Sequence, residues 1–348
     1  MANKNLNKAK EAKKDEFYTQ LEDINNEVRH YRKHFKRKTV LCNCDDPRVS
    51  NFFKYFAYNF EFLGLKKLIA TCYKNQDVNL FSDGKSERAV YLIYEGIKNG
   101  NHIPDDDEIQ VLPLKGDGDF RSPECIEFLK EADIIVTNPP FSLFREYVSL
   151  LMKYDKKFLI IGNINAIKYK EIFPLLQQNR IWIGNGFNLS LIYKTPYNNE
   201  LEANRKFVSS KGYDPDQNYI KVPGVAWYTN LDHKRRHEDV ILYKSFSEEE
   251  YPIYENYDAI DVKDYNEIPF DYEGVMGVPF TFMGKYNPDQ FEVIGLAHGN
   301  LGVKAGLKPY DRTLKKLNKG LRDGDLYYLN KDMPVIPYTR VLIRKKKS

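Results

Sequence analysis

The residues of this chain with the clearest chemical potential are four in a row, Asn138-Pro139-Pro140-Phe141. An amine on a nucleobase, or a side-chain amide, delocalises its nitrogen lone pair into the neighbouring π-system and is therefore a weak nucleophile. Hydrogen-bond acceptors aimed at its two N–H groups favour the tetrahedral geometry that the nitrogen needs to attack an electrophilic methyl group. The Asn138 side-chain oxygen is one such acceptor, and the Pro139 carbonyl is another, held by a backbone that two prolines restrict. The tetrapeptide therefore predicts methyl transfer to an amino nitrogen.

Phe141 offers a flat ring on which a planar base can stack, a contact worth roughly 1–3 kcal/mol per base. The alternative is structural: a Pro-Pro turn after a buried strand, with Phe141 covering the core. The position favours the chemical interpretation, because the motif directly follows the apolar run 133–137. Ligands of open α/β sheets bind at the carboxyl ends of strands.

The elements that must hold this motif alternate between apolar runs and amphipathic stretches. Strands are predicted at 39–42, 67–70, 109–112, 134–136 and 158–161. Helices are predicted between most of them, at 49–62, 86–96, 123–132 and 143–154. Such alternation is typical of a parallel sheet wrapped by helices. The sequence thus predicts an α/β fold with a doubly wound, mostly parallel sheet.

After about residue 185 the sequence becomes rich in Tyr, Asn, Pro and Gly. Short apolar runs lie at 189–193 and 225–228, those at 278–282, 291–294 and 340–343 indicate a smaller mixed domain, and the acidic segment 248–261 is expected to be a linker or an irregular loop. We expect three parts: a basic arm at 1–14, an α/β domain at 15–245 and a smaller α+β region at 246–348.

Composition limits the classes of protein that this chain can be. With 348 residues the chain has room for two domains, and a charged fraction of 29% with a mean hydropathy of −0.60 is typical of a soluble protein. Neither a signal-peptide pattern nor a bilayer-length apolar stretch is present, so a cytoplasmic location is expected. Cys42, Cys44, Cys72 and Cys125 form neither a zinc signature nor a disulfide framework, so no metal is expected.

Basic residues are clustered although the net charge is only +4. The residues predicted to contact nucleic-acid phosphates are Lys10, Lys13 and Lys14, then Arg235 and Arg236, and finally Lys345 and Lys346. A solvated surface or a frayed end is the alternative for each cluster. Several such clusters in a chain with 14% aromatic residues favour a nucleic-acid partner over a small metabolite.

The tetrapeptide closely resembles the [Asn/Asp/Ser]-Pro-Pro-[Tyr/Phe/Trp] motif of S-adenosylmethionine-dependent amino methyltransferases. Three longer segments, 42–56, 138–147 and 274–279, strongly resemble the EcoRI-type adenine-specific DNA modification methylases. The resemblance spans nearly the whole chain and weakens between about 185 and 220 and after about 295, where target recognition would differ. It implies methyl transfer from S-adenosylmethionine to adenine N6 in a short duplex DNA sequence, which protects host DNA from a cognate endonuclease. A monomer is expected, because such an enzyme can modify each strand of a palindrome in turn.

The resemblance also implies where the cofactor binds. The residues expected to contact it are Phe17, Tyr18, Thr19, Asn43, Asp45, Asp46, Thr71, Asp119 and Phe120. Residues 17–19 resemble an element that covers the methionine part, and residues 43–46 follow the first strand, where the family places its cofactor loop. Thr71 stands after the second strand in place of the usual acidic residue, with Asp77 as an alternative, and 119–120 match an Asp-Phe element that contacts the cofactor adenine.

The sequence departs from the family pattern near two of these segments. Gln20 replaces the usual proline after residues 17–19, and the usual glycine-rich pattern after the first strand is absent. An Asp helix cap followed by Pro47 would explain the second segment without any ligand. A plain Gly-Asp turn is the alternative for 116–119, where Asp119 is favoured over Asp117 because Phe120 follows it.

Residues 225–231 form an aromatic stretch where base-flipping relatives supply a second stacking residue. A duplex base must leave its stack to reach Asn138, so Trp227 or Tyr228 is expected to sandwich it against Phe141. A place in the core is an equal alternative for Trp227.

Two other functions stay open at this point. The first is methylation of an RNA adenine or a protein glutamine amide, because the motif reports the amino acceptor and not its polymer. The second is a catalytically silent DNA-binding module that keeps the fold, which the irregular cofactor loop allows.

Overall fold

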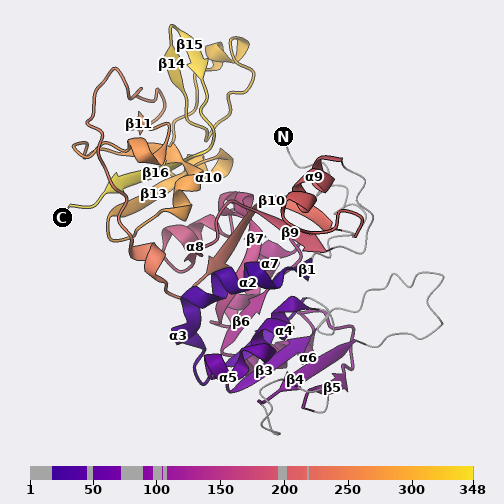
Figure 1. The fold of residues 1–348 in the computed structure, drawn as a ribbon. Helices are drawn as coiled ribbons and strands as arrows, with labels where there is room; N and C mark the ends of the chain where they lie inside the picture. The colour runs from indigo at the N-terminus through magenta and orange to yellow at the C-terminus, as the bar shows by residue number, and fades with distance from the viewer. Residues whose placement is uncertain are drawn as a thin grey trace. The chain divides into compact units, whose positions relative to one another are not determined.

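The computed structural model describes residues 18–44, 50–71, 89–96, 104, 108–194, 202–217 and 219–347. The chain forms two compact units (Figure 1). Unit 1 comprises Met1–Ile164 and Ile183–Asp232, and unit 2 comprises Asn165–Trp182 and His233–Ser348. The last boundary between the compact units therefore follows Asp232. The division into functional parts at 1–14, 15–245 and 246–348 stays a prediction.

Unit 1 is organised around one large sheet with the strand order β1-β9-β10-β7-β6-β2-β3-β4-β5 (Figure 1). The strands are β1 (Tyr18–Thr19), β2 (Thr39–Cys42), β3 (Lys67–Thr71), β4 (Val90–Tyr94), β5 (Gln110–Pro113), β6 (Ile134–Thr137), β7 (Lys157–Asn163), β9 (Leu189–Lys194) and β10 (Tyr219–Thr229), with β8 (Trp182–Ile183) at the junction of the two units. The central strands β3, β2, β6 and β7 are parallel to one another. The strands on either side of them pair antiparallel.

The centre of this sheet confirms the predicted α/β class. β2 and β6 are buried at every position, as expected for parallel strands that are covered on both faces and read as continuous apolar runs. The parallel character is confined to these central strands, because the flanking strands β4, β5, β9 and β10 are joined to their neighbours in antiparallel pairs.

The helices of unit 1 begin and end where local sequence signals allow. They are α2 (Leu21–Val28), α3 (Arg32–Phe35), α4 (Asn51–Tyr58), α5 (Phe60–Leu63), α6 (Pro123–Glu131), α7 (Phe144–Lys153) and α9 (Glu202–Ser210). The Ser122 hydroxyl caps α6 by accepting from the Cys125 N–H at 3.2 Å, with proline at the first helical position. α7 buries Phe144, Tyr147, Val148 and Leu151, which lie on one face of the helix.

One sequence-based expectation in unit 1 is wrong. The segment 86–96, predicted to be helical, contains the strand β4, which pairs antiparallel with β3 and β5. Four of its residues 90–94 are valine, isoleucine or tyrosine, and such residues favour strands. The alternative of an Asp cap followed by Pro47 lies outside the described residues, and the helix that follows, α4, begins at Asn51 and is capped by Ser50, which accepts from the Phe52 N–H at 3.2 Å.

Unit 2 contains a sheet with the order β11-β12-β16-β13 and a separate two-stranded hairpin. Its strands are β11 (Ile260–Asp261), β12 (Met276–Pro279), β13 (Phe291–Ala297), β14 (Tyr328–Asn330), β15 (Met333–Val335) and β16 (Arg340–Lys345), and its helices are α8 (Phe173–Gln177) and α10 (Gly299–Lys304). The apolar run 278–282 is only partly a strand, because β12 begins at Met276 and ends at Pro279. Pro279 has no N–H to donate, and the chain continues from Phe280 as a 3-10 helix.

The segment Asn165–Trp182 is part of unit 2 through α8. The Gln177 side chain donates to the Ile294 carbonyl of β13 at 2.8 Å. A buried ion pair lies in the same unit, where Arg340 Nε donates to Asp261 Oδ1 at 2.8 Å and the Tyr254 hydroxyl donates to the same oxygen. Within the described ranges, no helix is both long and apolar enough to cross a membrane.

Candidate active site at the carboxyl ends of the parallel strands

The Asn-Pro-Pro-Phe motif directly follows β6, in the middle of the parallel part of the sheet. Asn138 is buried, with 7% of its surface exposed, and Pro139 is buried beside it. Pro140 and Phe141 are half-buried, and the Phe141 ring packs against the hydrophobic core of unit 1. The structural alternative therefore describes the part of the Phe141 ring that meets the core, while another part stays exposed and stacking on a base stays a prediction.

The loops after β2 and β6 are joined by direct hydrogen bonds. The Thr137 hydroxyl, immediately before Asn138, donates to the Asn43 carbonyl. The Tyr147 hydroxyl of α7 donates to the Asn43 side-chain oxygen. All of these groups are neutral and buried, and β2 and β6 are neighbours in parallel register. Asn43 of the predicted cofactor loop and Thr137, the residue before the predicted catalytic motif, thus belong to one polar cluster.

Tyr147 connects this cluster to a third predicted segment. Its ring meets the Phe120 ring edge-on, with the ring centres 5.0 Å apart. Burial raises the pKa of Tyr147 well above its usual range, and Cys44 adds to the effect, so the hydroxyl stays a neutral donor. Sequence reasoning missed Tyr147 and Thr137. The signal for Tyr147 was a hydroxyl on the otherwise apolar face of α7.

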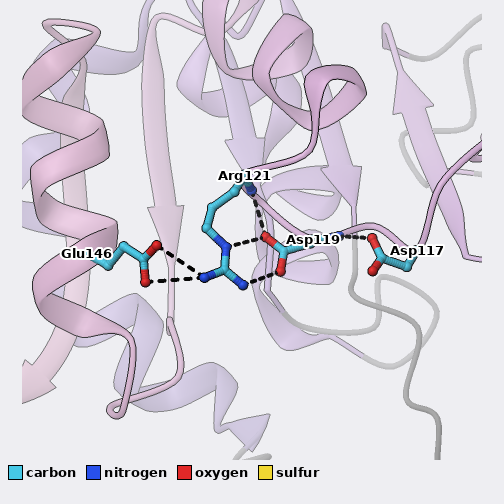
Figure 2. Close-up of polar contacts among 4 residues, drawn as sticks. All are labelled: Asp117, Asp119, Arg121 and Glu146. Atoms are coloured by element: carbon cyan, nitrogen blue, oxygen red, sulfur yellow. Dashed lines mark hydrogen bonds and ion pairs between the residues drawn. The ribbon is translucent and has the colours of Figure 1, made fainter.

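The Asp119 carboxylate is held by Arg121 (Figure 2). Arg121 Nε donates to Asp119 Oδ1 at 2.8 Å and Nη2 donates to Oδ2 at 2.5 Å, while Nη1 reaches Glu146 Oε1 at 3.1 Å. The Arg121 hydrogen bonds lower the pKa of Asp119, which therefore stays an anionic acceptor. Arg121 therefore links Asp119 of the Asp-Phe segment to Glu146 on α7, the helix that follows the motif. Glu146 directly precedes Tyr147 on this helix.

Asp117 makes the turn that was the alternative for this segment. Its Oδ1 accepts from the Asp119 N–H at 3.0 Å, and Gly118 has the positive φ of 79° that such a turn uses (Figure 2). Arg121 and Glu146 were not predicted from sequence, because their pairing depends on how α7 packs.

The element predicted to cover the methionine part of the cofactor lies beside the start of α4. The Asn51 side chain donates to the Thr19 carbonyl at 2.7 Å. The Thr19 hydroxyl oxygen is buried and has no hydrogen-bond partner within the described ranges, which fits a site whose remaining partner is a ligand. Tyr18 contributes its backbone to β1, and the predicted residues Phe17, Asp45 and Asp46 lie outside the described residues.

Thr71 is buried at the carboxyl end of β3, next to β2 in the sheet. Burial raises the pKa of Cys125 on α6, and hydrogen bonds from Ser122 and Thr71 oppose that rise. Thr71 therefore lies beside α6, at the same edge of the sheet as Asn43. The alternative residue Asp77 lies outside the described ranges.

Trp227 and Tyr228 are core residues in this structure. Trp227 is 1% exposed and meets Phe52 edge-on at 6.1 Å, while Tyr228 is fully buried and donates its hydroxyl to the Asn163 carbonyl at 2.9 Å. The core alternative therefore describes Trp227. A base could not reach either ring without a change in packing, so Phe141 is the better-supported stacking residue.

The basic residues predicted to bind phosphates differ in their surroundings. The Arg236 guanidinium lies over the Trp182 ring at 3.9 Å and donates to Asn179 at 3.1 Å, and Lys345 donates to the Phe270 carbonyl. Arg235 is half-buried and Lys346 is exposed. Lys10, Lys13 and Lys14 lie outside the described residues. Across the part of the chain that the structure describes, no group of three or more His, Cys, Asp or Glu side chains could hold a metal ion.

Comparison with known proteins gives one family model and three curated relatives. The family model described as Adenine-specific methyltransferase EcoRI matches residues 5–346. The chain is 47% identical over 348 residues to the type II methyltransferase M.EcoRI of Escherichia coli, covering 99% of this chain and 97% of that protein. It is 41% identical over 298 residues to M.MpnI of Mycoplasma pneumoniae, covering 83% and 84%, and 36% identical over 346 residues to M.MgeORF184P of Mycoplasma genitalium, covering 98% of each. No solved structure matches significantly.

Proposed function

Because this chain belongs to the family of EcoRI-type adenine-specific methyltransferases, we propose that it transfers a methyl group from S-adenosylmethionine to adenine N6 in a short sequence of duplex DNA. The family assignment agrees with the one predicted from residues 42–56, 138–147 and 274–279. Its relatives are type II methyltransferases, which supports a role in a restriction–modification system.

The observation that carries the proposal is the hydrogen-bonded cluster at the ends of β2 and β6. Thr137 and Tyr147 both donate to Asn43, so the loop that carries Asn138 is fixed against the loop expected to hold the cofactor. Methyl transfer requires donor and acceptor atoms in line and close together, and such pre-orientation contributes a large part of enzymatic rate enhancement. A silent binding module would have no need for this arrangement.

S-adenosylmethionine supplies an electrophilic methyl group when it is bound. Asn138 and the Pro139 carbonyl accept hydrogen bonds from the two hydrogens of the adenine amine and stabilise it as it becomes tetrahedral. Pro140 restricts the turn, and Phe141 stacks on the flipped base. The nitrogen–carbon bond forms as the sulfur–carbon bond breaks, and the amine then releases one proton to solvent. The reaction needs no covalent enzyme intermediate, no general base and no metal.

The residues that would hold the cofactor are those that surround the cluster. The buried Thr19 hydroxyl has acceptor and donor capacity that the described residues do not use. Asp119 uses its two oxygens for Arg121, and a carboxylate has about four lone-pair sites, so acceptor capacity remains for an amino group. The other members of the proposed set are Phe17, Tyr18, Asn43, Asp45, Asp46, Thr71 and Phe120.

The deciding experiment is single-molecule sequencing of DNA from cells that express either this protein or its Asn138→Ala variant. N6-methyladenine in one short motif, present only with the unaltered protein, is the expected result. If soluble, cofactor-binding protein leaves DNA unmodified, the same purified protein should be assayed on RNA and on peptide glutamine. Transfer to either of those would replace duplex DNA as the proposed substrate.

We also propose that the enzyme acts as a monomer in the cytoplasm, alongside a cognate endonuclease. A monomer can methylate the two strands of a recognition sequence in turn. Light scattering of the protein with and without duplex DNA tests the oligomeric state, and a mass near twice that of the 40.9 kDa chain would contradict it.

A further inference from the structure

One segment of unit 2 carries a charge out of proportion to its length. Residues 304–322, which we term the basic loop, contain seven Lys and Arg side chains and one acidic side chain, a net charge of +6. The whole chain carries only +4, so the remaining residues sum to −2. The basic loop begins at Lys304, the last residue of α10, and ends before β14 (Figure 1). A positive charge concentrated in this way attracts anions locally, although the protein as a whole is almost balanced.

Most of the cations in the basic loop form no ion pair or side-chain hydrogen bond with another described residue. Arg312 pairs with Asp323 at 2.7 Å, and Lys315 donates to the Lys319 and Leu321 carbonyls. The other cations are Lys304, Lys308, Lys316, Lys319 and Arg322, which are exposed and whose side chains make no ion pair or hydrogen bond within the described ranges. Two cations thus shape the loop, while the remaining cations face solvent.

The ends of the basic loop are fixed by close backbone packing. A Cβ atom added to Gly302 would meet the backbone of Gly324, and one added to Gly324 would meet the backbone of Gly299. These glycines therefore allow the backbone on either side of the basic loop to come into direct contact, which larger residues would prevent. Gly324 also has a positive φ of 84°.

Asn256 holds the same two ends from a second side. This buried side chain donates to the Lys308 carbonyl at 3.2 Å and to the Asp325 carbonyl at 2.9 Å, and the Lys308 N–H donates to the Asn256 carbonyl at 3.0 Å. The basic loop is therefore anchored at its ends by hydrogen bonds and close backbone packing. Groups held in place before binding lose less entropy when they meet a partner.

We infer that the basic loop binds the phosphate backbone of duplex DNA and supplies a sequence-independent part of substrate affinity. This inference rests on the proposed function, which makes duplex DNA the substrate, and it adds a surface that the clusters at 10–14, 235–236 and 345–346 do not include. Exposed lysines and arginines release condensed counterions when they neutralise phosphates, and such contacts position a protein without reading its bases.

The test is a triple variant, Lys316→Gln/Lys319→Gln/Arg322→Gln, with Lys206→Gln/Lys263→Gln/Lys285→Gln as its matched control. Both variants lose three exposed cations that form no ion pair among the described residues, and only the first loses them from the basic loop. Equilibrium binding to duplex oligonucleotides, with and without the recognition sequence, is measured across a range of salt concentrations.

For the basic-loop variant, the slope of log affinity against log salt should become shallower by about 0.9 per lost contact, or roughly 2.7 in total. The loss should be the same with and without the recognition sequence, and methyl transfer at saturating DNA should not change. The control should keep the unaltered slope. An unchanged slope in the basic-loop variant, or an equal change in the control, overturns the inference.

The outcome separates this inference from the proposed function. If the unaltered protein neither binds nor methylates duplex DNA, the proposed function fails. If it does both and the variant binds with the unaltered slope, only the inference fails. Thermal unfolding confirms that each variant is folded, and Lys304→Gln/Lys308→Gln tests the other end of the loop should the triple variant unfold; here the slope should fall by about 1.8.

Discussion

The cluster around Asn43 in unit 1 and the basic loop in unit 2 use polar side chains in opposite ways. The first consists of neutral, buried groups joined across 94 and 104 residues of sequence. The second consists of charged, exposed groups within 19 consecutive residues. A reaction centre needs groups of fixed geometry in a site that excludes water, where each hydrogen bond has most effect. A surface for a polyanion needs cations that remain hydrated until the phosphate arrives. The difference indicates that the reaction and the binding of a polyanion depend on different sets of residues in this chain.

Removing the amide of the catalytic motif should have the largest effect. We expect Asn138→Ala to lower the turnover number by about 10²- to 10³-fold, the usual effect of losing one hydrogen bond aimed at a transition state. DNA affinity and its salt dependence should stay unchanged, which steady-state kinetics and binding titrations measure. Asn138→Asp keeps an acceptor oxygen and should retain more activity than alanine. An equal loss of DNA binding would break the proposed separation.

Loosening the cluster should have a smaller effect. Tyr147→Phe leaves the ring against Phe120 but removes the hydroxyl donor to the buried Asn43 side-chain oxygen, which keeps only the weak donor Cys44 Sγ at 3.6 Å. We expect a loss of about 1–3 kcal/mol in the free energy of unfolding. We expect the Michaelis constant for S-adenosylmethionine to rise more than DNA affinity falls. Denaturant unfolding and kinetics at varied cofactor concentration check both points, and Tyr154→Phe, at a half-buried tyrosine directly after the same helix, serves as the control.

The Asp23 carboxylate, which is partly buried in unit 1, should lower the stability of the folded protein when it is charged. Burial, together with the neighbouring Glu22, raises the pKa of Asp23 from 3.8 to about 6. The folded state thus favours the protonated form, so this carboxyl contributes stability below about pH 4 that is lost as the pH rises through about 6. Asp23→Asn should stabilise the protein by about 1 kcal/mol at pH 8, allowing for partial exposure, and change little at pH 4. Equal effects in melts at the two pH values would contradict this.

The ion pair at the rim of the site should matter least. Arg121 lowers the pKa of Asp119, so the stability that this carboxylate gains is complete above about pH 5 and is lost as the pH falls below 4. Because both Arg121 and Glu146 are about half exposed, we expect Arg121→Gln to cost no more than about 1 kcal/mol at pH 7. The loss should shrink with added salt and at pH 3. A salt-independent loss would mean that Arg121 acts through packing.

The parts of the structure that were predictable are those with local signals. The central strands β2, β3, β6 and β7 are continuous apolar runs, and they lie where those runs are. β4 lies within a longer amphipathic stretch whose pattern predicts a helix, although most of its own five residues favour a strand. The antiparallel pairing with β3, which the sequence does not reveal, decides between the two.

The candidate site shows the same division. The sequence of residues 138–141 carries its own chemistry, so the motif could be found without a structure. The hydrogen bond from Tyr147 to Asn43 joins residues 104 apart, and the Arg121 pair with Glu146 joins residues 25 apart. Which residues form such pairs depends on how the helices and strands pack together. Burial also settled what sequence left open for Trp227, because only the fold shows which aromatic rings face the core.

The bond between Thr137 and Asn43 has a consequence for the order of folding. The Asn43 carbonyl belongs to the loop after β2, and its donor is synthesised 94 residues later. An emerging chain that ends before β6 can form local helices but lacks the partner that fixes this loop. Contacts so distant in sequence close slowly, because a long stretch of chain must first be ordered. The reaction centre should therefore mature as one of the last events of folding in unit 1, and a ligand that bridges the two loops would hasten it.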